Sequence, residues 1–94
     1  MHKYESIILV DDNLTQKQKE NTIEMVKKFI NENGEISKIE ILGSKKLAYE
    51  VRKQKTAYYC VFNFIAEPTV ILELERKYRL TDEIIKYITI RIDE

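Results

Sequence analysis

The sequence predicts an α+β domain in which four strands and two helices follow one another in the order βαββαβ. Three observations indicate this class. Two segments repeat apolar residues at helical spacing, four segments are rich in β-branched and aromatic residues, and turn residues separate them. The chain has 94 residues, enough for one small domain spanning residues 1–94. The low content of glycine and proline, two and one residues, argues against a disordered chain.

The first strand is expected from Lys3 to Val10 and leads into a turn. Its last four residues, 7–10, are all apolar, so the strand carries apolar side chains on both faces. A strand of this kind is usually central in its sheet and covered on both sides. The following segment, Asp11–Asn13, has the composition of a turn.

The first helix is expected to begin after Thr15 and to end before Gly34. Thr15 and Gln18 have the spacing of a capping box, in which each side chain hydrogen-bonds the backbone N–H of the other residue. Apolar residues then recur at helical spacing, at Ile23, Val26, Phe29 and Ile30. Gly34 is expected to end the helix because glycine accepts the left-handed conformation that is common just past a helix end.

Two strands are expected in the middle of the chain. The second strand is indicated by four apolar residues that lie close together, Ile36, Ile39, Ile41 and Leu42. It bends at Gly43 and continues to Val51, with apolar and polar residues alternating. A basic turn at residues 52–55 leads to the third strand, Tyr58–Ala66, whose aromatic and β-branched side chains favour a central position.

The second helix and the last strand complete the pattern. Pro68 suits the first turn of a helix, and an apolar stripe continues through Arg79, at Val70, Ile71, Leu74 and Tyr78. The last strand spans residues 84–92, with isoleucines 88, 90 and 92 on one face. This order predicts a ferredoxin-like fold, a four-stranded antiparallel sheet with both helices on one face.

The other face of the sheet is expected to bind a partner. The strands offer it Ile7 or Ile8, Val61 or Phe62, and Ile88 or Ile90. Such a face is too apolar to lie in water. The alternation of the last strand makes three residues the candidate partner-binding set: Ile88, Ile90 and Ile92.

The sequence argues against an enzyme, a metal site and a cofactor. Sixteen basic and sixteen acidic residues give zero formal charge, which excludes a uniformly basic nucleic-acid coat. His2, the only histidine, lies at the terminus without an orienting partner, and the one cysteine, Cys60, is expected in the core. No glycine-rich phosphate loop is present. The single cysteine and the lack of an apolar leader favour the cytoplasm.

One segment, residues 44–55, is locally basic. Against the single acid Glu50 it contains Lys45, Lys46, Arg52, Lys53 and Lys55. Tyr49 lies inside it, and basic groups beside aromatic rings can pair with phosphates while the rings stack on bases. These residues are therefore candidates for RNA binding. The alternative is a solvated hairpin whose lysines keep a strand edge soluble.

Several short motifs resemble the family of bacterial ribosomal protein S six. They are Tyr4-Glu5 in the first strand, Gly43-Ser44-Lys45-Lys46-Leu47-Ala48-Tyr49 in the second, Tyr58-Tyr59 in the third and Asp82-Glu83 before the last. The family typically has a glycine, a short basic stretch and then Leu-Ala-Tyr at the second of these places. The ordered set covers nearly the whole chain.

The resemblance implies a structural component of the small ribosomal subunit. Members bind the central domain of small-subunit rRNA together with ribosomal protein S eighteen, with which they form a heterodimer. The resemblance assigns RNA contacts to His2, Lys3, Tyr4, Lys45, Lys46 and Lys86. The family often has arginine where this chain has His2 and these last three lysines, and lysine binds phosphate without the bidentate fork of arginine.

Two other functions remain compatible with the predicted fold. A small-molecule-sensing regulatory domain would dimerise through its sheet and bind a ligand at the interface, and it would have a glycine-containing loop after the first strand. An acylphosphatase-like enzyme would need a phosphate-cradling loop with an arginine at that place, and a catalytic asparagine. The loop Asp11–Asn13 contains neither glycine nor arginine.

Overall fold

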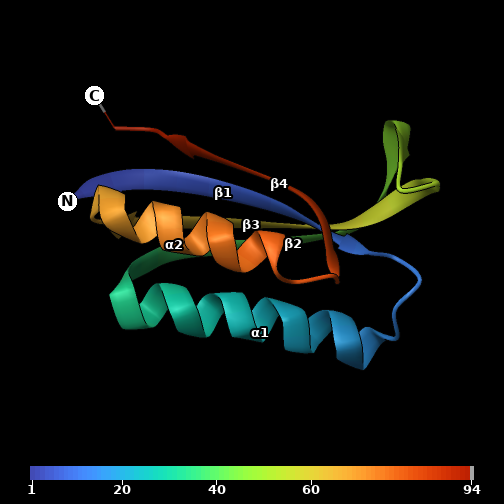
Figure 1. Ribbon diagram of the computed structural model, residues 1–94, viewed down its shortest axis with the longest axis horizontal. Coiled ribbons are helices and arrows are strands. Elements are labelled where there is room, and N and C mark those ends of the chain that lie inside the picture. Colours follow the sequence, from blue (N-terminus) through green and yellow to red (C-terminus); the bar gives the residue numbers. More distant parts are fainter. Residues whose placement is uncertain (94) are drawn as a thin grey trace.

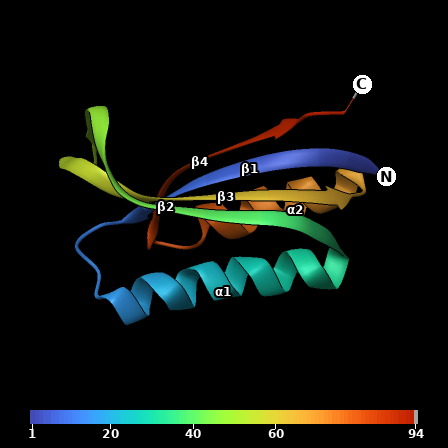
Figure 2. The same ribbon diagram turned by 180° about the vertical axis from the view of Figure 1, so that it is seen from behind.

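The computed structural model describes residues 1–93, and within them the elements follow the predicted order (Figure 1). They are β1 (His2–Asp11), α1 (Gln16–Asn33), β2 (Gly34–Val51), β3 (Gln54–Ala66), α2 (Pro68–Arg79) and β4 (Ile84–Arg91). The strands form one antiparallel sheet in the order β2-β3-β1-β4. Both helices cover the same face of this sheet (Figures 1 and 2). The ferredoxin-like fold, with β1 and β3 at its centre, is therefore confirmed.

The main core lies between the helices and the sheet. Ile8 and Phe62 are fully buried there, so their neighbours Ile7 and Val61, which pair with each other, point to the opposite face. We call this opposite face, which carries no helix, the open face. The helices contribute five fully or nearly fully buried apolar residues to the core: Ile23, Val26, Ile30, Leu74 and Tyr78.

Helix α1 has the predicted ends, but the reason for its end differs from the prediction. Thr15 Oγ1 accepts from the backbone N–H of Gln18 at 3.2 Å, and Gln18 Oε1 accepts from that of Thr15 at 2.9 Å, which completes the capping box. Gly34, however, has a φ of −168° and is extended, not left-handed. A Cβ at this position would overlap the backbone carbonyl oxygen of Ile65. Glycine is therefore needed here because β2 approaches β3 closely.

Beyond Gly43, β2 and β3 leave the sheet as a two-stranded arm, residues 44–56. Gly43 has a φ of +78°, which supports the predicted bend. Pairing continues past it from Ser44 opposite Tyr58, with a register shift before the last pair at the tip. The two tip residues, Arg52 and Lys53, have φ angles of +49° and +64°. Figures 1 and 2 show the arm curving away from α1 toward the side of the open face.

Three hydroxyl groups link α2 to β1 and β4 inside the core. Ser6 Oγ lies 2.8 Å from Tyr78 Oη and 3.0 Å from Thr89 Oγ1. Burial raises the pKa of Tyr78 well above its usual value, so this phenol stays protonated at neutral pH. Because Tyr78 is buried, its hydroxyl depends on Ser6 for a hydrogen-bond partner, whereas Ser6 also has Thr89.

Ser6→Ala should destabilise the protein more than Tyr78→Phe does. Ser6→Ala leaves the buried Tyr78 hydroxyl without a partner and should cost about 1–3 kcal/mol, whereas Tyr78→Phe leaves Ser6 bonded to Thr89 and should cost about 1 kcal/mol. Urea unfolding at pH 7 measures both losses. The double variant should recover part of the Ser6→Ala loss. A larger loss for Tyr78→Phe than for Ser6→Ala would contradict the hydroxyl chain.

The two glycines should respond differently to substitution because Gly34 is needed for space and Gly43 for its backbone angle. At Gly34, both alanine and asparagine should lower the free energy of unfolding, by about 1–3 kcal/mol for alanine and more for the larger asparagine. At Gly43, asparagine should cost less than alanine, because asparagine adopts positive φ more readily. Urea unfolding of the four variants gives both rank orders. The same order at both glycines would argue against this distinction.

Candidate RNA and partner interface

The open face is apolar toward the arm and more polar at its other end. Strand register gives three rows across β3, β1 and β4, which are Asn63–Glu5–Ile90, Val61–Ile7–Ile88 and Tyr59–Leu9–Lys86. The centre of the first row is a carboxylate, and the centres of the other two are apolar. The predicted apolar surface is therefore concentrated in the half nearest the arm.

The arm and the open face together enclose a pocket of about 330 Å³. Ile7, Leu9, Tyr59 and Ile88 line it from the sheet, and Leu47, Tyr49 and Val51 line it from the arm. Lys86 lies beside it, with Nζ 5.4 Å from the centre of the Tyr49 ring, a cation–π distance. This pocket can take an apolar group from a partner. The lining residues from the sheet and those from the arm come from distant parts of the sequence.

The arm carries exposed basic side chains on both of its faces. Lys45 pairs with Ala57 and Lys46 with Thr56, and successive side chains of a strand point in opposite directions. Both lysines are exposed and lie within β2, which continues past them to Val51. Pairing with β3 along the arm keeps the strand extended past them.

The tip of the arm is also basic. Arg52, Lys53 and Lys55 are exposed there. Arg52 Nη1 donates to the backbone carbonyl oxygen of Asp82 at 3.2 Å, which ties the tip to the turn before β4.

The residues predicted to bind RNA fall into two groups at the two ends of β1. Lys86 pairs with Leu9 and belongs with the arm. The structure thus brings together Lys45, Lys46, Tyr49, Arg52, Lys53, Lys55 and Lys86. The other group, residues 2–4, lies at the start of β1 (Figure 1). The rise per residue of a β-strand puts the two ends of β1 about 30 Å apart.

The structure changes the surroundings expected for two of the three N-terminal residues. Tyr4 faces the helices, is only 7% exposed and stacks on Phe64 with 5.8 Å between ring centres. Its ring therefore offers no surface on which a base could stack. His2 lies within β1 and has a partner that the sequence did not indicate, because its Nδ1 is 3.2 Å from Asp93 Oδ2. A hydrogen bond from Arg91 Nε and this contact with His2 lower the pKa of Asp93 to about 2.

The remaining chemical candidates have structural explanations. Cys60 is fully buried, as predicted, and burial raises the pKa of its thiol to about 11, so it stays protonated at neutral pH. Within residues 1–93, no cluster of three or more His, Cys, Asp or Glu side chains could hold a metal ion. Over the same residues, neither helix is long and apolar enough to cross a membrane.

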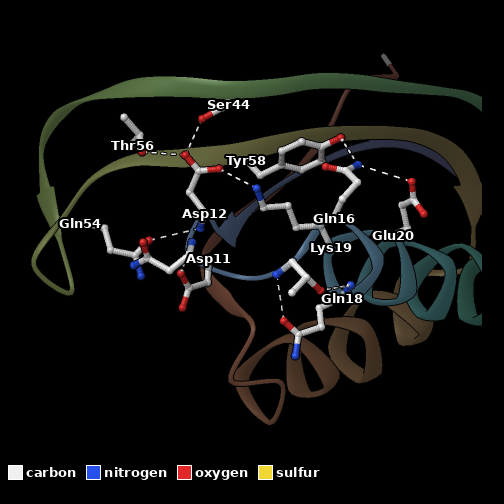
Figure 3. Close-up of polar contacts among 12 residues, drawn as sticks. Asp11, Asp12, Gln16, Gln18, Lys19, Glu20, Ser44, Gln54, Thr56 and Tyr58 are labelled. Atoms are coloured by element: carbon white, nitrogen blue, oxygen red, sulfur yellow. Dashed lines mark hydrogen bonds and ion pairs between the residues drawn. The ribbon is translucent and has the colours of Figure 1, made fainter.

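Asp12 is a polar centre that sequence reasoning assigned only to a turn. Its carboxylate accepts hydrogen bonds from Lys19 Nζ at 2.9 Å, from Thr56 Oγ1 at 2.7 Å and from Ser44 Oγ (Figure 3). The hydrogen bond from Ser44, followed by those from Thr56 and Lys19, lowers the pKa of Asp12 to about 2. The donors lie up to 44 residues away in the sequence, so no local motif could have indicated this arrangement.

Comparison with known proteins confirms the resemblance found in the sequence. The family model described as ribosomal protein S6 matches residues 3–91. The chain is 39% identical over 98 residues to the small ribosomal subunit protein bS6 of Heliobacterium modesticaldum, covering 100% of this chain and 99% of that protein. It is 38% identical over 95 residues to bS6 of Caldanaerobacter subterraneus, covering 100% of both.

A solved structure agrees with this result. The crystal structure of 30S ribosomal protein S6 from Thermotoga maritima has a TM-score of 0.93 and 39% sequence identity, and the match covers 97% of this chain and 87% of that one. Agreement in sequence and fold thus extends over nearly the full chain. The protein belongs to the ribosomal protein S6 family.

Proposed function

We propose that the protein is a structural component of the small ribosomal subunit that binds the central domain of small-subunit rRNA together with ribosomal protein S eighteen. Family membership supports the ribosomal role. The observation that carries the finer assignment is the arm, which presents basic residues next to an apolar pocket. The protein then acts in translation within cytoplasmic ribosomes, without catalysis and without a cofactor.

We assign the main RNA contacts to the arm and Lys86. Five basic residues and one acid lie between residues 44 and 55, so the arm is positive although the chain as a whole is neutral. Phosphate contacts from lysines orient a protein on RNA, whereas single-stranded elements and RNA shape supply selectivity. The exposed ring of Tyr49 offers a stacking surface for a base within this group.

A second, smaller RNA contact is assigned to the start of β1. Lys3 is exposed there, whereas the His2 ring is engaged with Asp93. Contact at both ends of β1 would fix the orientation of the protein on the RNA better than the arm alone.

We assign the partner-binding surface to the pocket and the exposed side of β4. Ile88, Ile90 and Ile92 are 54%, 46% and 47% exposed, and they extend the apolar surface from the pocket along this edge of the sheet. A run of half-exposed isoleucines costs free energy in water and gains it when a protein covers the run. The chemistry of this surface suits an apolar segment of ribosomal protein S eighteen.

Replacing both Lys45 and Lys46 with alanine should weaken the salt dependence of RNA binding. Each phosphate neutralised adds about 0.7–0.9 to the slope of log K against log salt concentration, so the double variant should lower that slope by between about one and two. The measurement is a titration of the rRNA central domain with ribosomal protein S eighteen at several salt concentrations.

Lys28→Ala, an exposed change on α1, serves as the control and should keep the wild-type slope. If the arm lysines only keep a strand edge soluble, the double variant will lose solubility but retain its slope and affinity. An unchanged slope would therefore refute the RNA assignment.

Ile88→Ser and Ile90→Ser should weaken binding of ribosomal protein S eighteen. Each change removes apolar surface that the partner would cover, at a cost of about 1–3 kcal/mol, or about 5-fold to 150-fold in Kd. Isothermal titration calorimetry with purified partner measures the effect. Leu72→Ser changes an even more exposed apolar residue on α2 and should bind normally. Equal weakening by all three variants would place the partner elsewhere.

A further inference from the structure

We propose that Asp12 is a positioning residue that fixes the root of the arm, where Ser44 and Thr56 leave the sheet. It thereby sets the position of the arm lysines, and of the arm residues that line the pocket, over the open face. Its effect on binding rests on the function proposed above. Its effect on the arm does not, and can be measured in the free protein.

Asp12 accepts hydrogen bonds through both of its carboxylate oxygens (Figure 3). One carboxylate oxygen, Oδ2, accepts from Ser44 Oγ and from Thr56 Oγ1, and the other, Oδ1, accepts from Lys19 Nζ. The backbone N–H of Asp12 also donates to Gln54 Oε1 at 3.4 Å. One residue thus contacts both strands of the arm and the first turns of α1.

These hydrogen bonds lie where the arm leaves the sheet. Ser44 is the first residue after the bend at Gly43, and Thr56 pairs with Lys46 on the facing strand. The pairing of β1 with β3 stops at Asp11 opposite Ala57, so β1 gives the arm no neighbouring strand beyond its root. A glycine bend in a two-stranded ribbon permits it to swing. Asp12 lies where such a swing would begin.

The cation on the other side of Asp12 is itself held in place. The Lys19 side chain is only 12% exposed, and that of Asp12 17%. Lys19 Nζ also lies 5.0 Å from the centre of the Tyr58 ring, and Gln16 Nε2 donates to Tyr58 Oη at 3.4 Å. Lys19 and Gln16 of α1 therefore hold the Asp12 side chain and the neighbouring Tyr58 ring in place.

Ionised carboxylate is the form this arrangement requires. Three donors converge on the two oxygens, and hydrogen bonds to an ionised acceptor are stronger than neutral ones. With a pKa of about 2, Asp12 stays ionised at neutral pH. Asparagine is a weaker replacement, because it lacks the negative charge that pairs with Lys19. Its NH₂ can only donate, so the two hydroxyls would have to turn and accept.

Amide hydrogen exchange measured by NMR tests the first part of the proposal in the free protein. Exchange of arm amides, relative to that of amides in the central part of β1 and β3, should speed up by about tenfold in Asp12→Asn and in Asp12→Ala. The core amides correct for any change in global stability. Ser44→Ala combined with Thr56→Val removes the arm's own donors and should reproduce the effect. Unchanged relative exchange in these variants would overturn the proposal.

RNA titration tests the consequence for binding. In Asp12→Asn the affinity for the rRNA central domain with ribosomal protein S eighteen should fall by about fivefold to tenfold with the salt slope unchanged, because the bound arm neutralises the same phosphates. This pattern differs from that of the Lys45 and Lys46 variants, which change the slope. Glu83→Gln removes one negative charge at the same end of the molecule and should leave arm exchange and affinity unchanged.

The two proposals can fail separately. An affinity loss in Glu83→Gln equal to that in Asp12→Asn would reduce the effect to net charge and overturn the positioning role. If wild-type protein does not bind the RNA and its partner, the proposed function fails, and the exchange measurement still decides whether Asp12 fixes the arm.

Discussion

The two central strands carry apolar side chains on both faces, and the rest of the architecture depends on covering them. On one side, Ile8 and Phe62 are buried under the two helices, which form an ordinary amphipathic layer. On the other side, Ile7 and Leu9 have no helix above them, and the arm covers part of this surface. What remains uncovered is the pocket and the exposed side of β4. The proposed partner surface is therefore the part of a two-sided core that the chain does not bury by itself.

The arm combines an apolar surface and a basic surface. Its inner side completes the pocket with Leu47 and Val51, and five of its exposed side chains are basic. Because the net charge is zero, long-range attraction to RNA is weak, and the proposed RNA binding depends on where these few charges lie. The bend at Gly43, the Asp12 hydrogen bonds and the contact of Arg52 with Asp82 all act on that position. An arm that is fixed before binding would lower the entropic cost of forming the proposed complex with RNA and partner.

Much of the fold could be predicted because its signals are local. The capping box at Thr15, the apolar stripe of α1 and the alternation in β4 each depend on residues only a few positions apart. The exposed basic arm was also recognisable, because its charges are adjacent in the sequence. The errors have a common origin in packing. Gly34 is required by a carbonyl oxygen on another strand, and the Tyr4 ring is buried by its stacking on Phe64.

The sequence by itself determined the order of elements, the family and the composition of the arm, since these follow from hydrophobic period, turn chemistry and short motifs. Only the tertiary structure decided which face of each strand meets the helices, that Lys86 joins the arm group, and that Asp12 receives donors from three elements. These features join residues that are from 7 to 77 positions apart. Contacts at such separations leave no periodicity in the chain, because strand register and the close packing of a finished core create them.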